Sequence, residues 1–259
     1  MLRDAASLYR RYREDGYLYL RGVLDPDELL RLRAAYFARF GPGYLKTGTS
    51  AEDGIFSGHP DPGFGAHGVP GHPAHAFVRS EVFDRFTRNS PLSALSEILL
   101  QGPAELLPRR IVRHFSRGTR RASRAHTDFD YLSRGSDQFV TCWIPIGPCP
   151  LSTGGIIYLE GSHQIGPDAI SMLRSVTDRP EDPRPISHDL DWVAHRLRRR
   201  WLWADYAVGD VAIHSPYTVH ATLDTETEVM RLSTDIRFIR RGEMVDERWT
   251  HPWSGDDGS

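Results

Sequence analysis

The chain has 259 residues, of which 39% are hydrophobic and 25% are charged, a composition typical of a folded globular domain. Its formal net charge of −2 argues against nucleic acid or an anionic membrane surface as a partner. The apolar stretches are too short to span a bilayer, and two cysteines are too few for a disulfide framework. We therefore expect a cytoplasmic protein with reduced thiols.

The first hundred residues predict mainly helices. Asp25 has the side chain of a helix N-cap, and Pro26 fits the first helical position, where its fixed φ suits the helix. Apolar residues then recur at helical spacing until a Gly-Pro-Gly sequence at 41–43 ends the pattern. The expected elements are a helix over 4–14, a strand over 17–20, a helix from 26 to about 40, and one or two helices within 81–101.

Residues 41–76 are rich in glycine and proline and predict little regular structure. A long irregular segment in a compact domain is usually functional, so we interpret this one as a candidate lid. It contains four histidines, but none forms the closely spaced ligand pairs of a metal site, and we expect no second metal centre there. These histidines are His59, His67, His72 and His75.

From residue 105 the sequence changes to short apolar runs separated by Gly, Pro, Ser and Asp. Short strands at regular spacing favour an all-β barrel or jelly roll. A polar insertion at 165–204, with one helix near Leu190 to Arg200, divides the runs into two groups. The runs are 105–115, 122–132, 138–146, 155–160, 210–214, 217–223 and 229–239.

This organisation predicts N-terminal helices packed on a β core whose strands supply a site. We expect a single domain over residues 1–259. Its parts are the N-terminal helices and candidate lid (1–104), the β core with its insertion (105–240), and a C-terminal tail (241–259).

The main chemical signal is a histidine and an aspartate two residues apart, His126 and Asp128. Because side chains alternate along a strand, both would point the same way and could reach one metal ion. The motif is weak alone, since a strand with polar edge residues shows the same pattern. Asp130 continues the alternation, so it can contact a substrate amine or hydroxyl, or pair with a nearby arginine. Tyr131 is a second candidate for substrate contact.

The second signal is His220, at the start of a later strand, followed by Arg231. A hairpin centred on residues 225 and 226 would place these two opposite each other, with Thr222 on the same face. Two histidines and one carboxylate on one side of a metal form the triad that favours non-haem Fe(II) and leaves positions open. Arg231 could then bind the far carboxylate of an iron-chelating 2-oxo acid, with Thr222 adding a hydroxyl.

Two neighbouring positions leave alternatives open. His214 follows a buried strand and competes as the third ligand, but it precedes a predicted Ser-Pro turn and lacks the hairpin relation to Arg231. Arg231 and Arg237 can instead be inward-facing partners of Asp235, and for Arg237 we favour that pairing.

In the order and spacing of these motifs, the chain resembles the phytanoyl-CoA dioxygenase (PhyH-like) family of Fe(II)- and 2-oxoglutarate-dependent oxygenases. The likeness runs from about residue 15 to residue 240. The matching stretches are Gly16 to Asp25, His126-Thr-Asp128, Trp143-Ile-Pro145, Gly154-Gly155 through His163, Gly209-Asp210, and His220 through Arg231.

The resemblance implies a mainly β fold with flanking helices around a double-stranded β-helix, the jelly-roll core of cupin-like proteins. It implies 2-oxoglutarate with its distal carboxylate on Arg231, and Thr222 matches a serine or threonine that relatives place on that carboxylate. Trp143 matches an aromatic residue near the co-substrate, although a plain core tryptophan fits equally well. The implied metal ligands are His126, Asp128 and His220.

The implied activity is oxidation of an unactivated C–H bond of a small molecule by hydroxylation, cyclisation or desaturation, using Fe(II), 2-oxoglutarate and O2. Many bacterial relatives act on small natural products, so we expect a role in bacterial secondary metabolism. Two alternatives stay open on the same barrel: a divalent-metal hydrolase or isomerase, and a silent metal-binding module. Arg231 with Thr222 argues against the first, and the complete set of site residues argues against the second.

Overall fold

The computed structural model describes residues 4–61, 63, 70–88, 91–118, 123–174 and 184–254. The strands are β1 (Tyr17–Leu20), β2 (Ala104–Leu106), β3 (Ile111–Phe115), β4 (Phe139–Pro145), β5 (Ile156–Leu159), β6 (Trp201–Leu202), β7 (Val211–His214), β8 (His220–Thr222) and β9 (Arg231–Arg240). The helices are α1 (Ala5–Asp15), α2 (Pro26–Phe37), α3 (Pro73–Phe77), α4 (Glu81–Arg88), α5 (Leu92–Leu100), α6 (Pro167–Arg174) and α7 (Leu190–Leu197).

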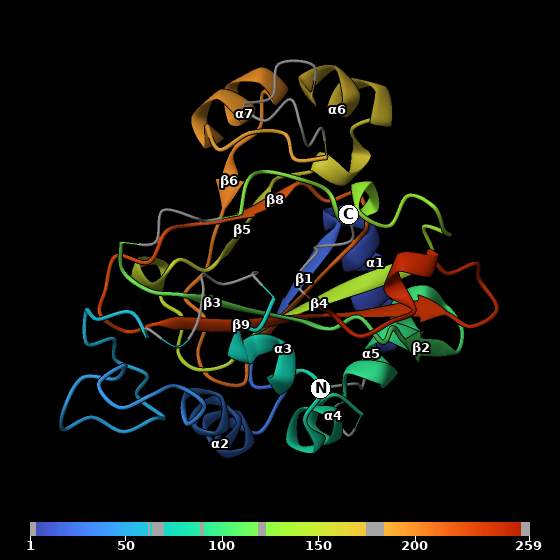
Figure 1. The fold of residues 1–259 in the computed structure, drawn as a ribbon. Helices are drawn as coiled ribbons and strands as arrows, with labels where there is room; N and C mark the ends of the chain where they lie inside the picture. The colour runs from blue at the N-terminus through green and yellow to red at the C-terminus, as the bar shows by residue number, and fades with distance from the viewer. Residues whose placement is uncertain are drawn as a thin grey trace.

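Two antiparallel sheets face each other, as Figure 1 shows. The larger has the strand order β1-β7-β4-β9-β2, with β3 also paired to β9, and the smaller has the order β6-β5-β8. Helices α2 to α5 lie on the outer side of the larger sheet, and α6 and α7 lie beyond the smaller one. This arrangement confirms the predicted jelly roll with flanking helices. Among the described residues, no helix is long and apolar enough to cross a membrane.

Alternation along the central strands separates the hydrophobic core from the barrel interior. On β4 and β9, the paired residues Cys142 and Ile236 belong to the main core, which the helices cover. The next residue of β4, Trp143, instead packs with residues of the smaller sheet. Both faces of these strands are therefore buried, and every polar side chain on the inner face needs a partner or a ligand.

Two sequence predictions about the strands are wrong. The strand predicted over 122–132 is not found in its described part, 123–132: Ala125 and His126 each make an isolated bridge, and Asp128–Asp130 turn as a 3-10 helix. The expected hairpin between β8 and β9 is also absent, because β8 pairs with β5 in the smaller sheet while β9 lies in the larger one. In a jelly roll, consecutive strands cross between the sheets, so this connection spans the barrel instead of closing a hairpin.

The polar insertion contains two helices, α6 and α7, where the sequence predicts one. Buried residues of both helices, including Ile170 and Val193, form a separate small core with Leu159 of β5. The chain returns along Ile186, which packs in the same cluster and lies next to the bridge between Ala125 and Ser187. The insertion is therefore fastened to the segment that precedes Asp128.

The segment interpreted as a lid contacts α2, through Arg33, and the chain before β9. Leu45 and Phe56 form a bridge within it, and Ile55 bridges to Val229 before β9. None of its described residues lines the three main cavities, so the lid role stays a prediction. Its described histidines do not gather: His59 is exposed, His72 caps α3, and His75 contacts Trp253 edge-on, whereas His67 lies outside the described residues.

A buried arginine of α2 connects this segment to the β core. Arg33 donates to the carbonyl oxygens of Ile146 at 2.9 Å and Met230 at 2.7 Å, and also to those of Glu52 and Asp53. Burial lowers the pKa of Arg33 to about 10, so the guanidinium stays charged at neutral pH.

Replacing Arg33 by leucine should lower the free energy of unfolding by about 3 kcal/mol, since it leaves two buried carbonyls without their donor. Chemical denaturation of both proteins measures this difference. Arg31→Leu, at an exposed position of the same helix, is the matched control and should cost less than about 0.5 kcal/mol. Equal losses in the two variants would contradict the bridging role of Arg33.

Candidate metal centre and co-substrate site

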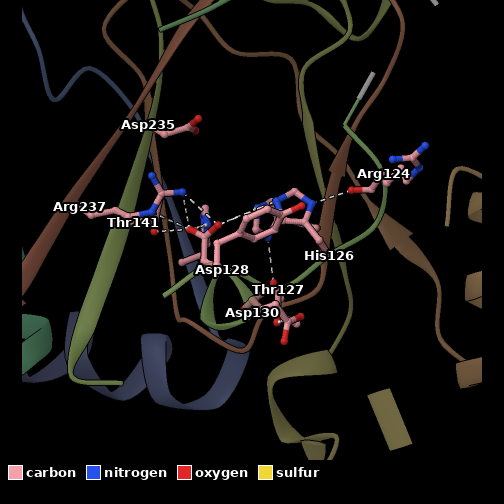
Figure 2. Close-up of polar contacts among 12 residues, drawn as sticks. Arg124, His126, Thr127, Asp128, Asp130, Thr141, Asp235 and Arg237 are labelled. Atoms are coloured by element: carbon pink, nitrogen blue, oxygen red, sulfur yellow. Dashed lines mark hydrogen bonds and ion pairs between the residues drawn. The ribbon is translucent and has the colours of Figure 1, made fainter. Parts of the chain in front are cut away.

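The three predicted metal ligands come from two chain segments that lie side by side and pair through their backbones. His126 and His220 form a two-residue bridge, in which the backbone N–H of each donates to the carbonyl of the other at 3.0 Å. Asp128 opens the 3-10 helix two residues later, and this turn directs its carboxylate back toward the imidazoles. The isolated bridge and the turn, and not the predicted strand, thus bring the three ligand side chains together (Figure 2).

The potential ligand atoms of these residues lie within 4.8 Å of one another, and among the described residues no other His, Cys, Asp or Glu group does so. The Asp128 Oδ1 atom lies 3.9 Å from Nε2 of His126 and 3.8 Å from Nε2 of His220. All three side chains are buried. Two neutral imidazoles and one carboxylate are the donor set of a non-haem iron site with open coordination positions.

Backbone carbonyls orient both imidazoles. Nδ1 of His126 lies 2.6 Å from the Arg124 carbonyl, and Nδ1 of His220 lies 2.9 Å from the Thr218 carbonyl. Because a carbonyl only accepts, each Nδ1 carries the proton and each Nε2 presents its lone pair to the centre. Burial lowers the pKa of His126 and holds that of His220 well below its usual value, so both rings are neutral and ready to bind a cation.

The second oxygen of Asp128 is held by the larger sheet. Thr141 of β4 donates to Oδ2, and Arg237 of β9 donates to the same oxygen at 3.0 and 3.2 Å and to Oδ1 at 3.1 Å. Burial alone would raise the pKa of Asp128, but the Arg237 charge and the contacts of His214 and His220 outweigh it and keep the pKa well below its usual value. Oδ1 therefore stays an anionic donor that faces the two imidazoles.

The expected pairing of Arg237 with Asp235 is wrong. Arg237 pairs with Asp128, whereas Asp235 accepts from Nε of Arg113 at 2.8 Å. The alternation along β9 correctly places Arg237 inside the barrel. Its partner could not be read from sequence, because the turn at 128–130 decides where the carboxylate lies.

His214 lies beside the cluster but outside the group of three. Its Nε2 is 3.4 Å from Oδ2 of Asp128, on the side already occupied by Arg237, and its Nδ1 is 2.9 Å from the hydroxyl of Tyr158. Its ring centre lies 4.3 Å from that of His220. This placement favours His220 over His214 as the third ligand and leaves His214 in contact with the aspartate.

Arg231 and Thr222 meet inside the barrel although their strands lie in different sheets. Nη2 of Arg231 donates to Oγ1 of Thr222 at 3.3 Å, Nη1 donates to the Gly154 carbonyl, and the guanidinium lies 4.1 Å from the ring centre of Phe115. The Thr222 oxygen also accepts from the Ser123 N–H at 2.8 Å. With both acceptor positions used, the hydroxyl proton of Thr222 is left to donate to a ligand oxygen.

Unsatisfied donors in the same interior mark space for a polar ligand. Among the described residues, Nε of Arg231, Nε1 of Trp143 and Oγ of Ser233 are buried without a hydrogen-bond partner. Burial lowers the pKa of Arg231 to about 10, so a full positive charge is present at neutral pH. Buried groups of this kind need an acceptor, and a dicarboxylate such as 2-oxoglutarate fits the chemistry.

The two residues predicted to contact substrate line different cavities. Tyr131 lines the cavity beside the metal cluster and contacts the His126 ring edge-on, with 5.4 Å between ring centres. Asp130 lines a neighbouring cavity and accepts from the Thr127 hydroxyl at 2.6 Å. The 3-10 helix interrupts the strand alternation on which the Asp130 prediction relied, and a substrate contact of Asp130 stays a prediction.

Comparison with known proteins identifies relatives of this fold and site. A model of the phytanoyl-CoA dioxygenase (PhyH) family matches residues 12–233. The chain is 29% identical over 251 residues to the 1-deoxypentalenic acid 11-beta-hydroxylase of Streptomyces arenae, covering 92% of this chain and 82% of that protein.

Two solved structures from nogalamycin biosynthesis share the fold. The epimerase SnoN, in complex with Fe3+, alpha ketoglutarate and nogalamycin RO, has a TM-score of 0.63 at 19% identity, covering 93% of this chain and 85% of SnoN. The alpha ketoglutarate dependent carbocyclase SnoK has a TM-score of 0.62 at 16% identity, covering 92% of this chain and 84% of SnoK.

The jelly roll and its buried His-Asp-His cluster define a non-haem iron oxygenase. The chain belongs to the phytanoyl-CoA dioxygenase family, and it uses Fe(II), 2-oxoglutarate and O2. The family, the fold class and these cofactors are confirmed as predicted from sequence.

Removing the Arg237 side chain should destabilise the metal-free protein by about 3–5 kcal/mol, because Asp128 would keep a buried charge without its partner. A bound divalent cation replaces that lost charge, so Co(II) should raise the melting temperature of Arg237→Met more than that of the unchanged protein. Denaturation with and without Co(II) measures both effects.

Arg241→Met is the matched control, one residue beyond the end of the same strand. Arg241 pairs with Glu105 at 2.9 Å, but both side chains are at least half exposed. Loss of this exposed ion pair should therefore cost at most about 1 kcal/mol. Equal destabilisation of the two variants, or an equal response to Co(II), would contradict the pairing of Arg237 with Asp128.

Proposed function

We propose that the protein oxidises an unactivated C–H bond of a small molecule in bacterial secondary metabolism. In this proposal iron binds His126, Asp128 and His220. The observation that carries it is the convergence of their ligand atoms within 4.8 Å, inside a barrel that also holds Arg231. The oxidation ends in hydroxylation, or in cyclisation or desaturation of the same substrate.

Iron held by His126, Asp128 and His220 would supply oxidation by dioxygen, coupled to the conversion of 2-oxoglutarate to succinate and CO2. The protein positions these groups. Arg231 holds the distal carboxylate of the co-substrate, and the free proton of Thr222 donates to the same carboxylate. Trp143 supplies an indole N–H in the same interior. The buried walls exclude water, and the cavity at Tyr131 admits the substrate to the open side of the centre.

The names of the relatives support a small-molecule substrate of this kind. The Streptomyces arenae relative is named for the hydroxylation of 1-deoxypentalenic acid, and SnoN and SnoK come from nogalamycin biosynthesis. We place the protein in the cytoplasm. Its two cysteines, Cys142 and Cys149, are buried free thiols, as suits a reducing compartment.

Anaerobic addition of 2-oxoglutarate to the Fe(II) protein should produce the metal-to-ligand absorption band of a chelated 2-oxo acid. Admission of oxygen should then release succinate in an iron-dependent manner. His126→Ala, which removes one ligand, should lose the band and the succinate together while its circular dichroism stays unchanged. A Zn(II)-supported reaction that forms no succinate would point instead to a hydrolase or isomerase.

Arg231→Ala should weaken 2-oxoglutarate binding by about 2–5 kcal/mol, because the distal carboxylate loses a desolvated charge partner. Titration of the anaerobic absorption band measures the dissociation constant directly. Arg240→Ala, at the exposed end of the same strand, is the control and should leave it unchanged.

Variants of Thr222 test the contribution of its hydroxyl to carboxylate binding apart from that of Arg231. Thr222→Val removes the donated proton and should also raise the dissociation constant, whereas Thr222→Ser keeps the proton and should restore it. An unaltered dissociation constant in both Arg231→Ala and Thr222→Val would place the co-substrate carboxylate elsewhere.

A further inference from the structure

Three side chains of the larger sheet contact the same oxygen of Asp128. Arg237 of β9, Thr141 of β4 and His214 of β7 are neighbours in the strand register, so they form one row across the sheet. Thr141 and Arg237 donate to Oδ2, and Nε2 of His214 lies 3.4 Å from it. Figure 2 shows the first two on one side of the carboxylate and His126 on the other. The row therefore surrounds Oδ2 and leaves Oδ1 to the imidazoles.

The neighbours of His214 indicate which of its nitrogens carries the proton. At 3.4 Å its contact with Asp128 is longer than an ordinary hydrogen bond, and Nε2 is a buried polar atom without another partner among the described residues. A carboxylate only accepts, so a lone pair on Nε2 would oppose Oδ2, whereas a proton there directs a donor at it. Nδ1 lies 2.9 Å from the hydroxyl of Tyr158, which has a proton to donate. The proton of the neutral ring therefore belongs on Nε2, the reverse of its place in His126 and His220.

Tyr158 is fixed between the two sheets. On β5 it lies directly opposite His220 of β8, with 6.2 Å between the ring centres. Its ring also stacks on Tyr17 of β1 at 4.6 Å, and Tyr17 is the register neighbour of His214. Tyr158 is buried, so its hydroxyl has a defined direction. The hydrogen bond from this hydroxyl to Nδ1 sets the orientation of the His214 imidazole.

The three groups around Oδ2 are not equivalent. Arg237 supplies the charge, but it also donates to Oδ1 at 3.1 Å, so it does not distinguish the two oxygens by itself. The contacts of Thr141 and His214 fall on Oδ2. These two side chains therefore give the carboxylate its direction.

We infer that His214 and Tyr158 are positioning residues that make Asp128 bind iron through Oδ1 alone. This inference rests on the proposed function. Tyr158 orients the His214 ring, and the Nε2–H of that ring completes the set of donors on Oδ2. A carboxylate that bound through both oxygens would occupy a coordination position that the triad otherwise leaves open. The pair thereby keeps room for a chelating 2-oxo acid and for dioxygen.

Nitrogen NMR of the metal-free protein, with isotope-labelled histidine, tests the hydrogen-bond pair without iron. The signals of His214 are identified by their loss in His214→Gln. The proton should lie on Nε2 in His214 and on Nδ1 in His126 and His220. Tyr158→Phe should shift the Nδ1 signal of His214 and leave the tautomers of the other two rings unchanged. A proton on Nδ1 of His214 would overturn the inference.

The absorption band of the anaerobic Fe(II)–2-oxoglutarate complex tests the effect on the metal centre. His214→Phe removes a donor from Oδ2, which makes the Asp128 carboxylate a stronger donor to iron, so the band should move to longer wavelength. His214→Gln supplies an amide N–H in place of Nε2–H and should restore the original wavelength. Ile213→Val, at the adjacent β7 position that packs in the main core, is the matched control and should leave the band unchanged.

A double-mutant cycle tests whether Tyr158 acts through His214. Tyr158→Phe should move the band in the same direction as His214→Phe, but by less. In the double variant it should add nothing, because residues that act through one contact are not additive. Fully additive shifts would overturn the role of Tyr158.

The band also separates the two levels of the proposal. Its absence from the unchanged protein would contradict the proposed function, whatever tautomers the NMR shows. Its presence at the same wavelength in the unchanged protein and in His214→Phe would overturn the positioning role while leaving the oxygenase intact.

Discussion

The pairing of the segment 125–126 with β8 is the constraint on which the site depends. Two reciprocal backbone hydrogen bonds place His126 opposite His220, with 4.2 Å between their ring centres. The same segment bridges on its other side to Ser187, so the insertion and the smaller sheet hold it between them. The 3-10 turn that follows places the Asp128 carboxylate within 4 Å of Nε2 of both imidazoles. Loss of this short pairing would separate ligands that lie far apart in the chain.

The aspartate shows how the larger sheet contributes to a site built on the smaller one. A buried carboxylate is unfavourable unless it is paired, and Arg237 and Thr141 satisfy it from adjacent strands. These contacts fall mainly on Oδ2, which leaves Oδ1 facing the imidazoles. Arg231, six residues before Arg237 on β9, faces the same interior. In the proposed site, one strand therefore supplies both the counter-charge of the metal ligand Asp128 and the anchor for the co-substrate.

The sequence predicted the elements whose signals are local, and it erred where distant segments meet. Asp25 and Pro26 predicted the start of α2, and the spaced apolar runs predicted the strands of a jelly roll. The ligands followed from residue types and from the family resemblance. The hairpin was wrong because β8 and β9 belong to different sheets, although Arg231 and Thr222 still meet across the barrel. The partners of Arg237 and the turn at Asp128 depend on tertiary contacts that no periodicity encodes.

The most direct measurement is a crystal structure of the anaerobic Fe(II) protein with 2-oxoglutarate bound. The account predicts one iron bound by Nε2 of His126, Nε2 of His220 and one oxygen of Asp128, with the distal carboxylate of 2-oxoglutarate on Arg231. Iron bound through His214 in place of either histidine, or a co-substrate carboxylate remote from Arg231, would contradict it.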